Sequence, residues 1–312
     1  MAGVYPPKDA EGAMRQTWQH YRQPYSLGEA LELLRQEGAD ARVVAGGTDV
    51  VVELGRGIRP ARTLVDITRV PGLRGIREDG DDIVLGALTT HNDVISSPLV
   101  REHGVPLAQA CLEVGAPQLR TRATVVGNLV TASPANDTLT PLLALDADLV
   151  LVSEEGERTV PIREFFTGYR QTALRRDELV REVRFRKLAP TERGVFLKLG
   201  LRRAQAISVI HLAVVLDLDG RTVVGARVAL GCLAPTVVRA PTVETFLQGR
   251  RLDVTTIREA ARRAQRDVSP IDDLRGSAAY RRLALERLLA HALDRIAAGE
   301  ERADWPASPV LL

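Results

Sequence analysis

The amino-acid sequence predicts an α+β fold. Apolar residues recur at helical spacing in some stretches and at strand spacing in others, and the two kinds of stretch do not alternate as regular βαβα units. The 312 residues, 45% hydrophobic and 26% charged, are typical of a globular protein with two domains or three small lobes. No long internal repeat is visible in the sequence.

The first section contains one clear helix. Residues 1–20 are polar and without periodicity, which indicates a flexible extension. Ser26 and Glu29 have the spacing of a capping box, and Gly38 can end the helix. Between them lie apolar residues at helical spacing: Leu27, Ala30, Leu31 and Leu34.

Two short strands are predicted after this helix. Residues 43–45 form an apolar run that leads directly into Gly46-Gly47-Thr48-Asp49. A second apolar run covers 50–52, and 63–67 are a further strand. We therefore expect a small βαβ-like lobe.

The second section mixes strands with broken helices. Residues 83–88 are expected to form a strand, and 149–160 a hairpin that turns around Gly156. In 182–187 apolar and charged residues alternate, so one face of that strand should be buried. Between these strands, 94–116 has helical stretches, interrupted by Pro98, Pro106 and Pro117.

The third section starts near Pro190. Residues 211–218 and 222–233 flank Asp219-Gly220, a strong hairpin signal. Two helices follow, the first capped by Asp253 or Thr256 and the second beginning near Ser277 and ending at Gly299. One stripe of the second helix is apolar: Leu285, Leu288, Leu289, Ala292, Leu293 and Ile296.

Composition excludes several classes of protein. Lys plus Arg is 42 and Asp plus Glu is 40, so the net charge of +2 gives no reason to expect nucleic-acid binding. Two cysteines, expected to be buried free thiols, cannot supply a disulfide framework or a four-cysteine iron–sulfur site. No apolar run approaches the roughly 18 residues of a membrane span, and residues 1–12 lack the apolar core of a signal peptide. We therefore expect a cytoplasmic protein.

The first candidate site is the segment around Gly46-Gly47. Two glycines after a strand leave the main chain bare, so that a diphosphate can approach the backbone N–H groups. The alternative is an ordinary tight turn, and the segment lacks the GxGxxG pattern of a Rossmann NAD site. The candidate residues are Val43, Val44, Ala45, Gly46, Gly47, Thr48, Asp49 and Val50.

The second candidate site is a polar, glycine-bearing turn that ends before an apolar helix at 142–145. Its hydroxyl and amide groups suit a phosphate and a ribose, and Asp137 can accept from a ribose or adenine group. The alternative is a polar loop with an Asx-type cap at Asp137. The candidate residues are Thr124, Val125, Val126, Gly127, Asn128, Ser133 and Asp137.

The third candidate is Lys198, in the otherwise apolar strand 196–203. A lysine among apolar neighbours requires a partner or an exposed tip. The N1–C2=O edge of a flavin, which gains negative charge on reduction, is one such partner, and solvent at a sheet edge is the alternative. Metal and serine-hydrolase chemistry are not indicated, because the histidines lack ligand spacing and no GxSxG elbow occurs.

Taken in order, these segments resemble one family, the FAD-binding medium subunit of carbon monoxide dehydrogenase and the equivalent domain of xanthine dehydrogenase. The resemblance extends from about Tyr21 to Ala298. It rests on six segments: 21–34 (Arg22-Gln23-Pro24 and Ser26-Leu27), Ala45 to Asp49, Thr124 to Asp137, Phe196 to Arg203, Gly231 to Thr236, and Pro270 to Arg275. The second of the two loops departs from the family pattern, because Val126 replaces a glycine.

The resemblance implies a fold and a set of cofactor contacts. A two-lobed FAD-binding domain of the PCMH type (21–188, lobes 21–75 and 76–188) would precede a flavoprotein C-terminal domain (189–300) of a small antiparallel sheet and helices, with a tail at 301–312. The two loops would wrap the FAD diphosphate and Asp137 would bind the adenosine portion. Leu179 and Lys198 would lie beside the isoalloxazine ring, and Val114 where some members place an aromatic residue. No acid–base catalyst is implied, because the flavin carries the redox chemistry.

The implied function is electron transfer within a molybdenum hydroxylase complex, as an oxidoreductase subunit in a dimer of heterotrimers. A large subunit would hold the molybdenum cofactor, and a small subunit would pass electrons from its [2Fe–2S] clusters to this FAD. NAD or a quinone would be the external acceptor. Two alternatives stay open: a stand-alone FAD-dependent oxidoreductase acting on a small metabolite, and a scaffold that has lost FAD.

Overall fold

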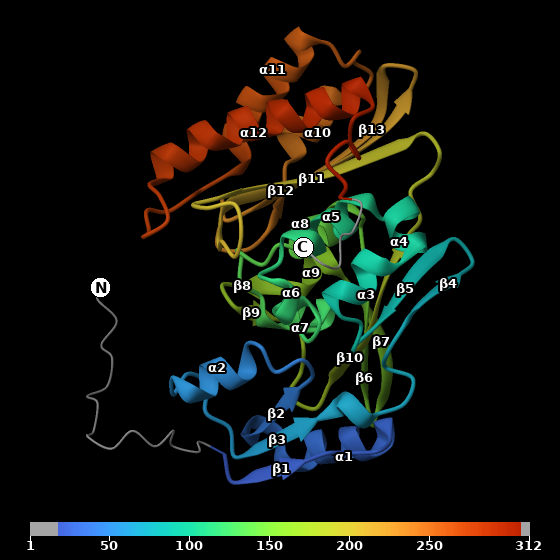
Figure 1. The fold of residues 1–312 in the computed structure, drawn as a ribbon, viewed down its shortest axis with the longest axis vertical. Coiled ribbons are helices and arrows are strands. Elements are labelled where there is room, and N and C mark those ends of the chain that lie inside the picture. The colour runs from blue at the N-terminus through green and yellow to red at the C-terminus, as the bar shows by residue number, and fades with distance from the viewer. Residues whose placement is uncertain (1–17, 307–312) are drawn as a thin grey trace.

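The computed structural model describes residues 18–306, which form three layers stacked along the long axis (Figure 1). We call them the first lobe (18–75), the second lobe (76–188) and the C-terminal part (189–306). This mixed architecture confirms the predicted α+β class. Among the helices of residues 18–306, none combines the length and hydropathy needed to cross a bilayer.

The first lobe has a three-stranded parallel sheet in the order β1-β3-β2. The strands are β1 (His20–Arg22), β2 (Ala41–Val44) and β3 (Thr63–Asp66), and the helices are α1 (Leu27–Glu37) and α2 (Val50–Gly55), with 3₁₀ turns at Gly38–Asp40 and Ile67–Arg69. The apolar run 50–52 therefore begins a helix. Residues 18–20 of the expected flexible extension are folded, because His20 pairs with Thr63; residues 1–17 lie outside the described part.

Helix α1 begins and ends where the sequence predicts. The Ser26 hydroxyl accepts from the Glu29 N–H at 3.1 Å, and Gly38 ends the helix with a φ of 53°. The capping box itself is incomplete: the Glu29 carboxylate accepts from the Tyr25 N–H at 2.8 Å instead of the Ser26 N–H.

The second lobe contains a five-stranded antiparallel sheet in the order β4-β5-β10-β6-β7. Its strands are β4 (Ile76–Asp79), β5 (Asp82–Gly86), β6 (Asp148–Ser153), β7 (Gly156–Pro161) and β10 (Leu179–Arg186). The expected hairpin is β6–β7. In the central strand β10, Val183 and Phe185 are buried, as the alternation predicts.

Short helices and one small hairpin complete the second lobe. The helices are α3 (His91–Ser96), α4 (Pro98–His103), α5 (Val105–Glu113), α6 (Pro117–Arg120), α7 (Val125–Thr131), α8 (Leu139–Ala144) and α9 (Ile162–Phe165), and the hairpin is β8 (Phe166–Gly168) with β9 (Gln171–Thr172). Pro98, Pro106 and Pro117 each lie in the first turn of a helix, where a missing N–H costs least. They therefore divide the helical stretch as expected.

The C-terminal part is an antiparallel sheet in the order β11-β12-β13-β14, with helices on one face. Its elements are β11 (Glu192–Gly200), β12 (Ser208–Asp219), β13 (Thr222–Gly231), β14 (Val238–Arg239), α10 (Pro241–Leu247), α11 (Val254–Arg263), a 3₁₀ turn (Ala264–Asp267) and α12 (Ala278–Ala298). The predicted hairpin is β12–β13. Asp253 caps α11 and Ser277 caps α12, whereas helix α10 has no counterpart among the predicted elements.

The sheet of the C-terminal part belongs to two hydrophobic cores. Along β12, Leu212 and Val214 face the core shared with α11 and α12. Ala213 and Val215 face the large core of the second lobe, with α5 and α8. Because successive side chains of a strand point to opposite faces, one strand joins both cores.

Residues 300–306 return to the second lobe. The Glu301 carbonyl accepts from the Gln109 side chain at 2.6 Å, and Arg302 donates to the Glu102 carbonyl at 2.8 Å. Trp305 packs partly buried against the core of the second lobe, with Arg101 over its ring. This segment thus ties the end of α12 to helices α4 and α5.

Candidate functional site

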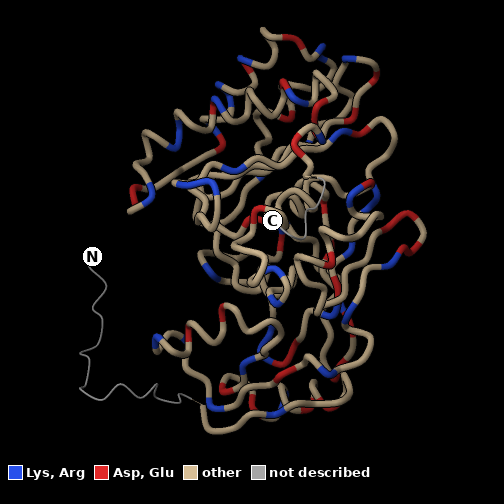
Figure 2. Tube along the Cα trace, viewed as in Figure 1, with Lys and Arg blue, Asp and Glu red and all other residues tan. Residues whose placement is uncertain are grey.

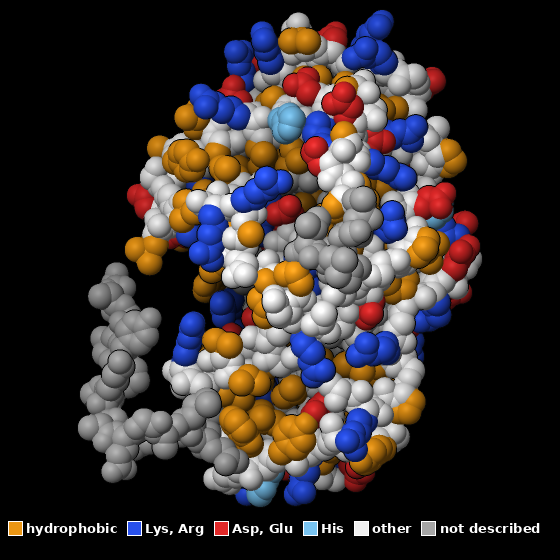
Figure 3. Space-filling model, viewed as in Figure 1, with side chains coloured by type: hydrophobic (Ala, Val, Ile, Leu, Met, Phe, Trp, Pro, Cys, Tyr) orange, Lys and Arg blue, Asp and Glu red, His pale blue; other side chains and the backbone are white. Residues whose placement is uncertain are grey.

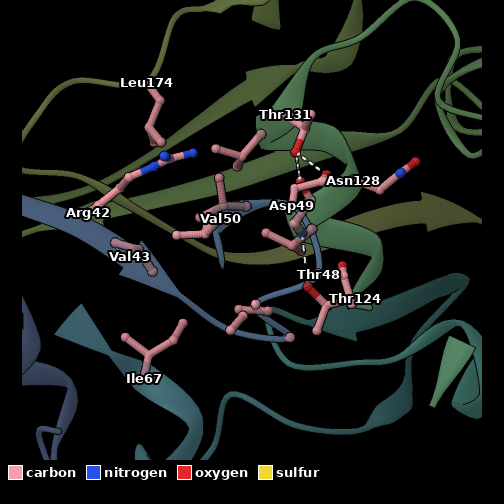
Figure 4. A pocket seen from close by; sticks show the side chains of 18 of the residues that line it. Arg42, Val43, Thr48, Asp49, Val50, Ile67, Thr124, Asn128, Thr131 and Leu174 are labelled. Carbon is pink, nitrogen blue, oxygen red and sulfur yellow. Dashed lines mark hydrogen bonds between the residues drawn. The ribbon is translucent and has the colours of Figure 1, made fainter. Parts of the chain in front are cut away.

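The two glycine-bearing loops, separated by about 80 residues in sequence, meet in the structure. A Cβ on Gly46 would lie 2.0 Å from the carbonyl oxygen of Arg122, so only glycine permits this contact. On the far side of the crossing, the Thr131 hydroxyl donates to the Asp49 carboxylate at 2.7 Å (Figure 4). The first lobe and the second lobe are therefore joined at the two segments that the sequence singled out.

Each of these loops leads into the N-terminus of a short helix. The first runs into α2. The second is helical from Val125, where the sequence predicts a polar turn, because the Thr124 hydroxyl caps the Gly127 N–H at 3.0 Å. Val126, which we expect to replace a glycine of the family pattern, lies in the first turn of α7 with its side chain buried.

Several backbone N–H groups at the crossing have no acceptor within residues 18–306. They belong to the five consecutive residues Gly46 to Val50 and to Val126. Gly47, which lies in this run, has a φ of 74°, a conformation that glycine adopts without strain. Unpaired N–H groups that converge from two helix starts favour an anionic ligand.

A cavity of about 1120 Å³ opens beside the crossing, between the first and second lobes. This volume exceeds the usual range of roughly 300–1,000 Å³ for small-molecule sites, so it suits a long ligand such as a dinucleotide. Figure 4 shows Val43, Val50, Ile67 and Leu174 around it, an apolar wall that can cover a planar ring.

Charged residues line the same cavity, five arginines against three carboxylates. The arginines are Arg42, Arg59, Arg170, Arg175 and Arg176, and the carboxylates are Asp49, Glu53 and Glu178. Figure 3 shows basic side chains along the indented edge, and Figure 2 shows charges of both signs spread over the rest of the trace. The excess of positive charge is thus local and matches an anionic ligand.

Most of the residues predicted from the sequence line this cavity. They are Val43, Ala45, Gly46, Gly47, Thr48, Asp49, Val50, Val114, Thr124, Val126, Gly127, Asn128 and Leu179. Five others do not: Val44, Val125, Ser133, Asp137 and Lys198.

Asp137 and Lys198 bind each other. Lys198 Nζ lies 2.6 Å from the Asp137 carboxylate, and both side chains are more than nine-tenths buried. The Ser208 hydroxyl donates to the other oxygen of Asp137 at 2.5 Å, and Lys198 also donates to the Glu113 carbonyl at 2.9 Å. Lys198 is thus not an exposed edge-strand residue, and its partner in the chain is Asp137.

A buried histidine continues this polar seam between the second lobe and the C-terminal part. His211 contacts the Thr140 hydroxyl through Nδ1 at 2.9 Å and the Pro134 carbonyl through Nε2 at 3.0 Å. A Cβ on Gly231 would lie 2.0 Å from the ring, so this glycine makes room for it. Burial lowers the pKa of His211, which keeps the imidazole neutral.

Two further buried groups lie under the second loop. His91 Nδ1 is 3.4 Å from Cys111 Sγ, and burial, together with the charge of Arg120, lowers the pKa of His91 to about 4. Burial also raises the pKa of both thiols, that of Cys232 to about 12. The two cysteines are buried and free, as predicted.

Sequence reasoning missed the charged wall of the cavity. Arg42, Glu53, Arg59, Arg170 and Arg175 all line it, but no motif in the sequence marks them as one group. The sequence signal that points to one of them is the run Phe166-Thr-Gly-Tyr-Arg170, a short turn with glycine and an arginine at its tip.

Two family descriptions match the chain. Residues 14–186 match "FAD binding domain in molybdopterin dehydrogenase", and residues 196–296 match "CO dehydrogenase flavoprotein C-terminal domain". The first match contains every residue of the two loops.

Curated relatives cover nearly the whole chain. The carbon monoxide dehydrogenase medium chain of Hydrogenophaga pseudoflava is 36% identical over 274 residues, 88% of this chain and 95% of the relative. The xanthine dehydrogenase FAD-binding subunit of Escherichia coli O157:H7 is 32% identical, over 84% of this chain and 90% of the relative.

Solved structures share the fold. A chain of the Hydrogenophaga pseudoflava carbon monoxide dehydrogenase that lacks the Mo-pyranopterin moiety superposes with a TM-score of 0.85 at 37% identity, covering 88% of this chain and 96% of that chain. A chain of quinoline 2-oxidoreductase from Pseudomonas putida 86 superposes with a TM-score of 0.85 at 27% identity, covering 91% and 98%.

Proposed function

Because the chain belongs to the FAD-binding flavoprotein subunits of the molybdenum-containing dehydrogenases, we propose that it relays electrons through FAD between a [2Fe–2S] partner subunit and an external acceptor. The partners would be a molybdenum-cofactor large subunit and an iron–sulfur small subunit, in a dimer of heterotrimers. The acceptor would be NAD or a quinone, and the complex would work in the cytoplasm.

The single observation that carries this proposal is the crossing of the two loops at Gly46. Unpaired N–H groups, a bare glycine backbone and an arginine-lined cavity of dinucleotide size occur together there. We propose that residues 43–50 and 124–128 hold the FAD diphosphate. Val114 and Leu179 would supply apolar contacts to its ring systems.

Lys198 and Asp137 act through their neighbours in this proposal. Lys198 donates to the carbonyl of Glu113, one residue before Val114, which lines the cavity. The buried pair thereby positions this part of the wall. Its two charges cancel, so electrostatic tuning of a flavin by Lys198 would depend on how the pair is oriented toward the ring.

FAD supplies the redox chemistry, since it can exchange electrons singly with a cluster and in pairs with an acceptor. The residues of this chain bind the cofactor, orient it and exclude water from it. With two cysteines, the chain cannot itself ligate a four-cysteine cluster, so the clusters would belong to a partner.

The test begins with the cofactor. Purified chain should retain FAD, visible as absorption near roughly 450 nm, a property of the flavin itself. Gly46→Val and Gly127→Val should each lose it, whereas Gly28→Val, on the outer face of α1 with nothing within 4 Å of an added Cβ, should retain it. Full flavin content in both loop variants would contradict the assignment of the loops.

Electron transfer needs a separate measurement. Mixing the FAD-loaded chain with a reduced [2Fe–2S] partner subunit should bleach the flavin band in a stopped-flow spectrometer, and NAD or a quinone should restore it. If the flavin stays oxidised in the assembled complex while the cluster is reduced, the relay proposal is wrong.

A further inference from the structure

The β8–β9 hairpin carries a side chain that reaches across the cavity to the other lobe. Arg170, between β8 and β9, donates from Nη1 to the Glu53 carboxylate on α2 at 3.0 Å. The Arg170 carbonyl accepts from the Arg59 guanidinium of the first lobe at 2.8 Å. Both the side chain and the main chain of this one residue are thus tied to the first lobe.

These contacts form part of the wall of the cavity. Glu53, Arg59 and Arg170 all line it, and so do Gln171 and Leu174 from the same hairpin segment. In Figure 1 the hairpin lies directly over α2, with the two elements belonging to different lobes. The cavity is therefore bounded by the Gly46–Arg122 contact at the loop crossing and by the Arg170–Glu53 contact at the hairpin.

The hairpin tip is held in an unusual conformation. Arg170 has a φ of 54°, in the left-handed region that a non-glycine residue enters at a cost of about 1 kcal/mol. The same backbone turn presents its carbonyl to Arg59 and its side chain to Glu53. A strained arginine at this position is explained by the two contacts it makes.

Glu53 is almost fully buried and accepts from two arginines. It pairs with Arg42 within the first lobe and with Arg170 from the second lobe. Burial strengthens the ion pairs, because little water competes for the carboxylate. Since Arg42 keeps the carboxylate in place, the Arg170 contact can break and re-form without leaving Glu53 unpaired.

From this geometry we propose that Arg170 is a latch residue that closes the β8–β9 hairpin over the bound cofactor and sets the rate at which FAD enters and leaves. The inference rests on the proposed binding of FAD in this cavity. Arg170 and Glu53 lie outside the two glycine-bearing loops, and in this proposal they position the hairpin over the cofactor.

The test compares FAD exchange in the wild type and in variants of the latch. FAD release is followed by the return of free-flavin fluorescence on dilution, and FAD uptake by its quenching when apoprotein is mixed with FAD. Arg170→Gly removes the latch and relieves the positive φ, so it should fold. We expect release and uptake rates to rise together, by about three- to tenfold, as suits loss of a partly buried ion pair. Arg170→Lys retains the positive charge, so its release and uptake rates should lie between those of the wild type and of Arg170→Gly.

Arg163→Ala is the matched control. Arg163 is an exposed arginine shortly before the hairpin, and it pairs with Glu164 of the same segment, not with the first lobe. Its loss should change neither the release rate nor the uptake rate.

The outcomes separate the two proposals. Wild-type protein that binds no FAD would overturn the proposed function itself. If the wild type binds FAD, two results in Arg170→Gly would overturn the latch alone: an unchanged release rate, or faster release with unchanged uptake. The second result counts against the latch because a lost contact without gating raises only the release rate.

Discussion

At the scale of single residues, we expect an added methyl group at Gly46 to impair both FAD binding and folding stability. Gly46→Ala would place Cβ 2.0 Å from the Arg122 carbonyl oxygen, which belongs to the backbone and cannot rotate away. We expect the two loops to separate, with loss of FAD and a decrease of about 1–3 kcal/mol in the free energy of unfolding. Flavin content and urea denaturation of the same preparations measure both effects.

Gly28→Ala is the same chemical change as Gly46→Ala, but we expect it to raise the free energy of unfolding instead of lowering it. Gly28 lies in the first turn of α1, has no atom within 4 Å of an added Cβ, and does not require a positive φ. Alanine should stabilise the protein by about 0.5 kcal/mol by restricting the unfolded chain. If Gly46→Ala were as well tolerated as Gly28→Ala, the close contact between the loops would not exist in solution.

The lowered pKa of buried His91 should make the free energy of unfolding depend on pH. Its pKa is about 4 in the fold and 6.5 unfolded, so between these values the unfolded chain binds the extra proton. Its contribution is fully present above pH 6.5 and is lost as the pH falls toward 4, by at most about 1.4 kcal/mol per pH unit. His211, whose pKa is also lowered by burial, adds a contribution of the same sign.

The measurement is the free energy of unfolding in urea at several pH values between roughly 4.5 and 7, which covers most of the interval between the two pKa values. His91→Gln should have the shallower slope, because the titrating group is gone. Equal slopes in the two proteins would show that His91 is not buried as a neutral imidazole.

At the scale of elements, the Lys198–Asp137 pair joins β11 to the segment before α8. Lys198→Met would leave Asp137 buried with Ser208 as its remaining side-chain partner among the described residues, at a cost of about 3 kcal/mol. Removing both charges in Lys198→Met with Asp137→Asn should recover part of that loss. A single variant no less stable than the double variant, by urea denaturation, would contradict the ion pair.

The sequence predicts most elements because their signals are local. Ser26 and Gly38 bound α1, and Asp219-Gly220 closes the β12–β13 hairpin, each through chemistry contained within a few residues. The α7 helix is not predictable in this way, because Thr124 to Asn128 has the composition of a turn and the helix depends on one capping bond. α10 is short, and its stability comes from packing on β13, a long-range contact.

The pairing of Asp137 with Lys198 could not be predicted from the sequence. Composition shows that each requires a partner, but not that each is the other's partner, 61 residues apart in sequence. The glycine loops are predictable because a bare backbone is itself a signal. The arginines around the cavity are not, since an arginine that lines a cavity has the same sequence signature as one in solvent.

At the scale of the whole molecule, Trp305 connects the end of the described chain to the second lobe. Its ring packs partly buried against the core of that lobe and lies under Arg101. Trp305→Ala should lower the free energy of unfolding by about 1–2 kcal/mol through lost apolar burial. The thermal midpoint should fall accordingly, and an unchanged midpoint would mean that residues 300–306 do not dock in solution.

The overall architecture follows from the resemblance more than from periodicity. Helix and strand patterns indicate the class, but nothing in them places the C-terminal sheet between α5 and α8 on one side and α12 on the other. Such layering depends on contacts between distant segments. The six motifs in order supply that information, and the matching relatives confirm the family.

Strand β12 finally constrains how the chain can assemble. Its odd-numbered residues Ala213 and Val215 and its even-numbered residues Leu212 and Val214 fill different interiors. A shift of one position against β11 or β13 would exchange the two sets, so a small alanine side chain would meet the space meant for leucine, and leucine the space meant for alanine. A register error in β12 therefore destabilises both cores at once. A C-terminal fragment that begins near residue 189 would expose the apolar face of the sheet that packs on the second lobe, and we expect it to aggregate.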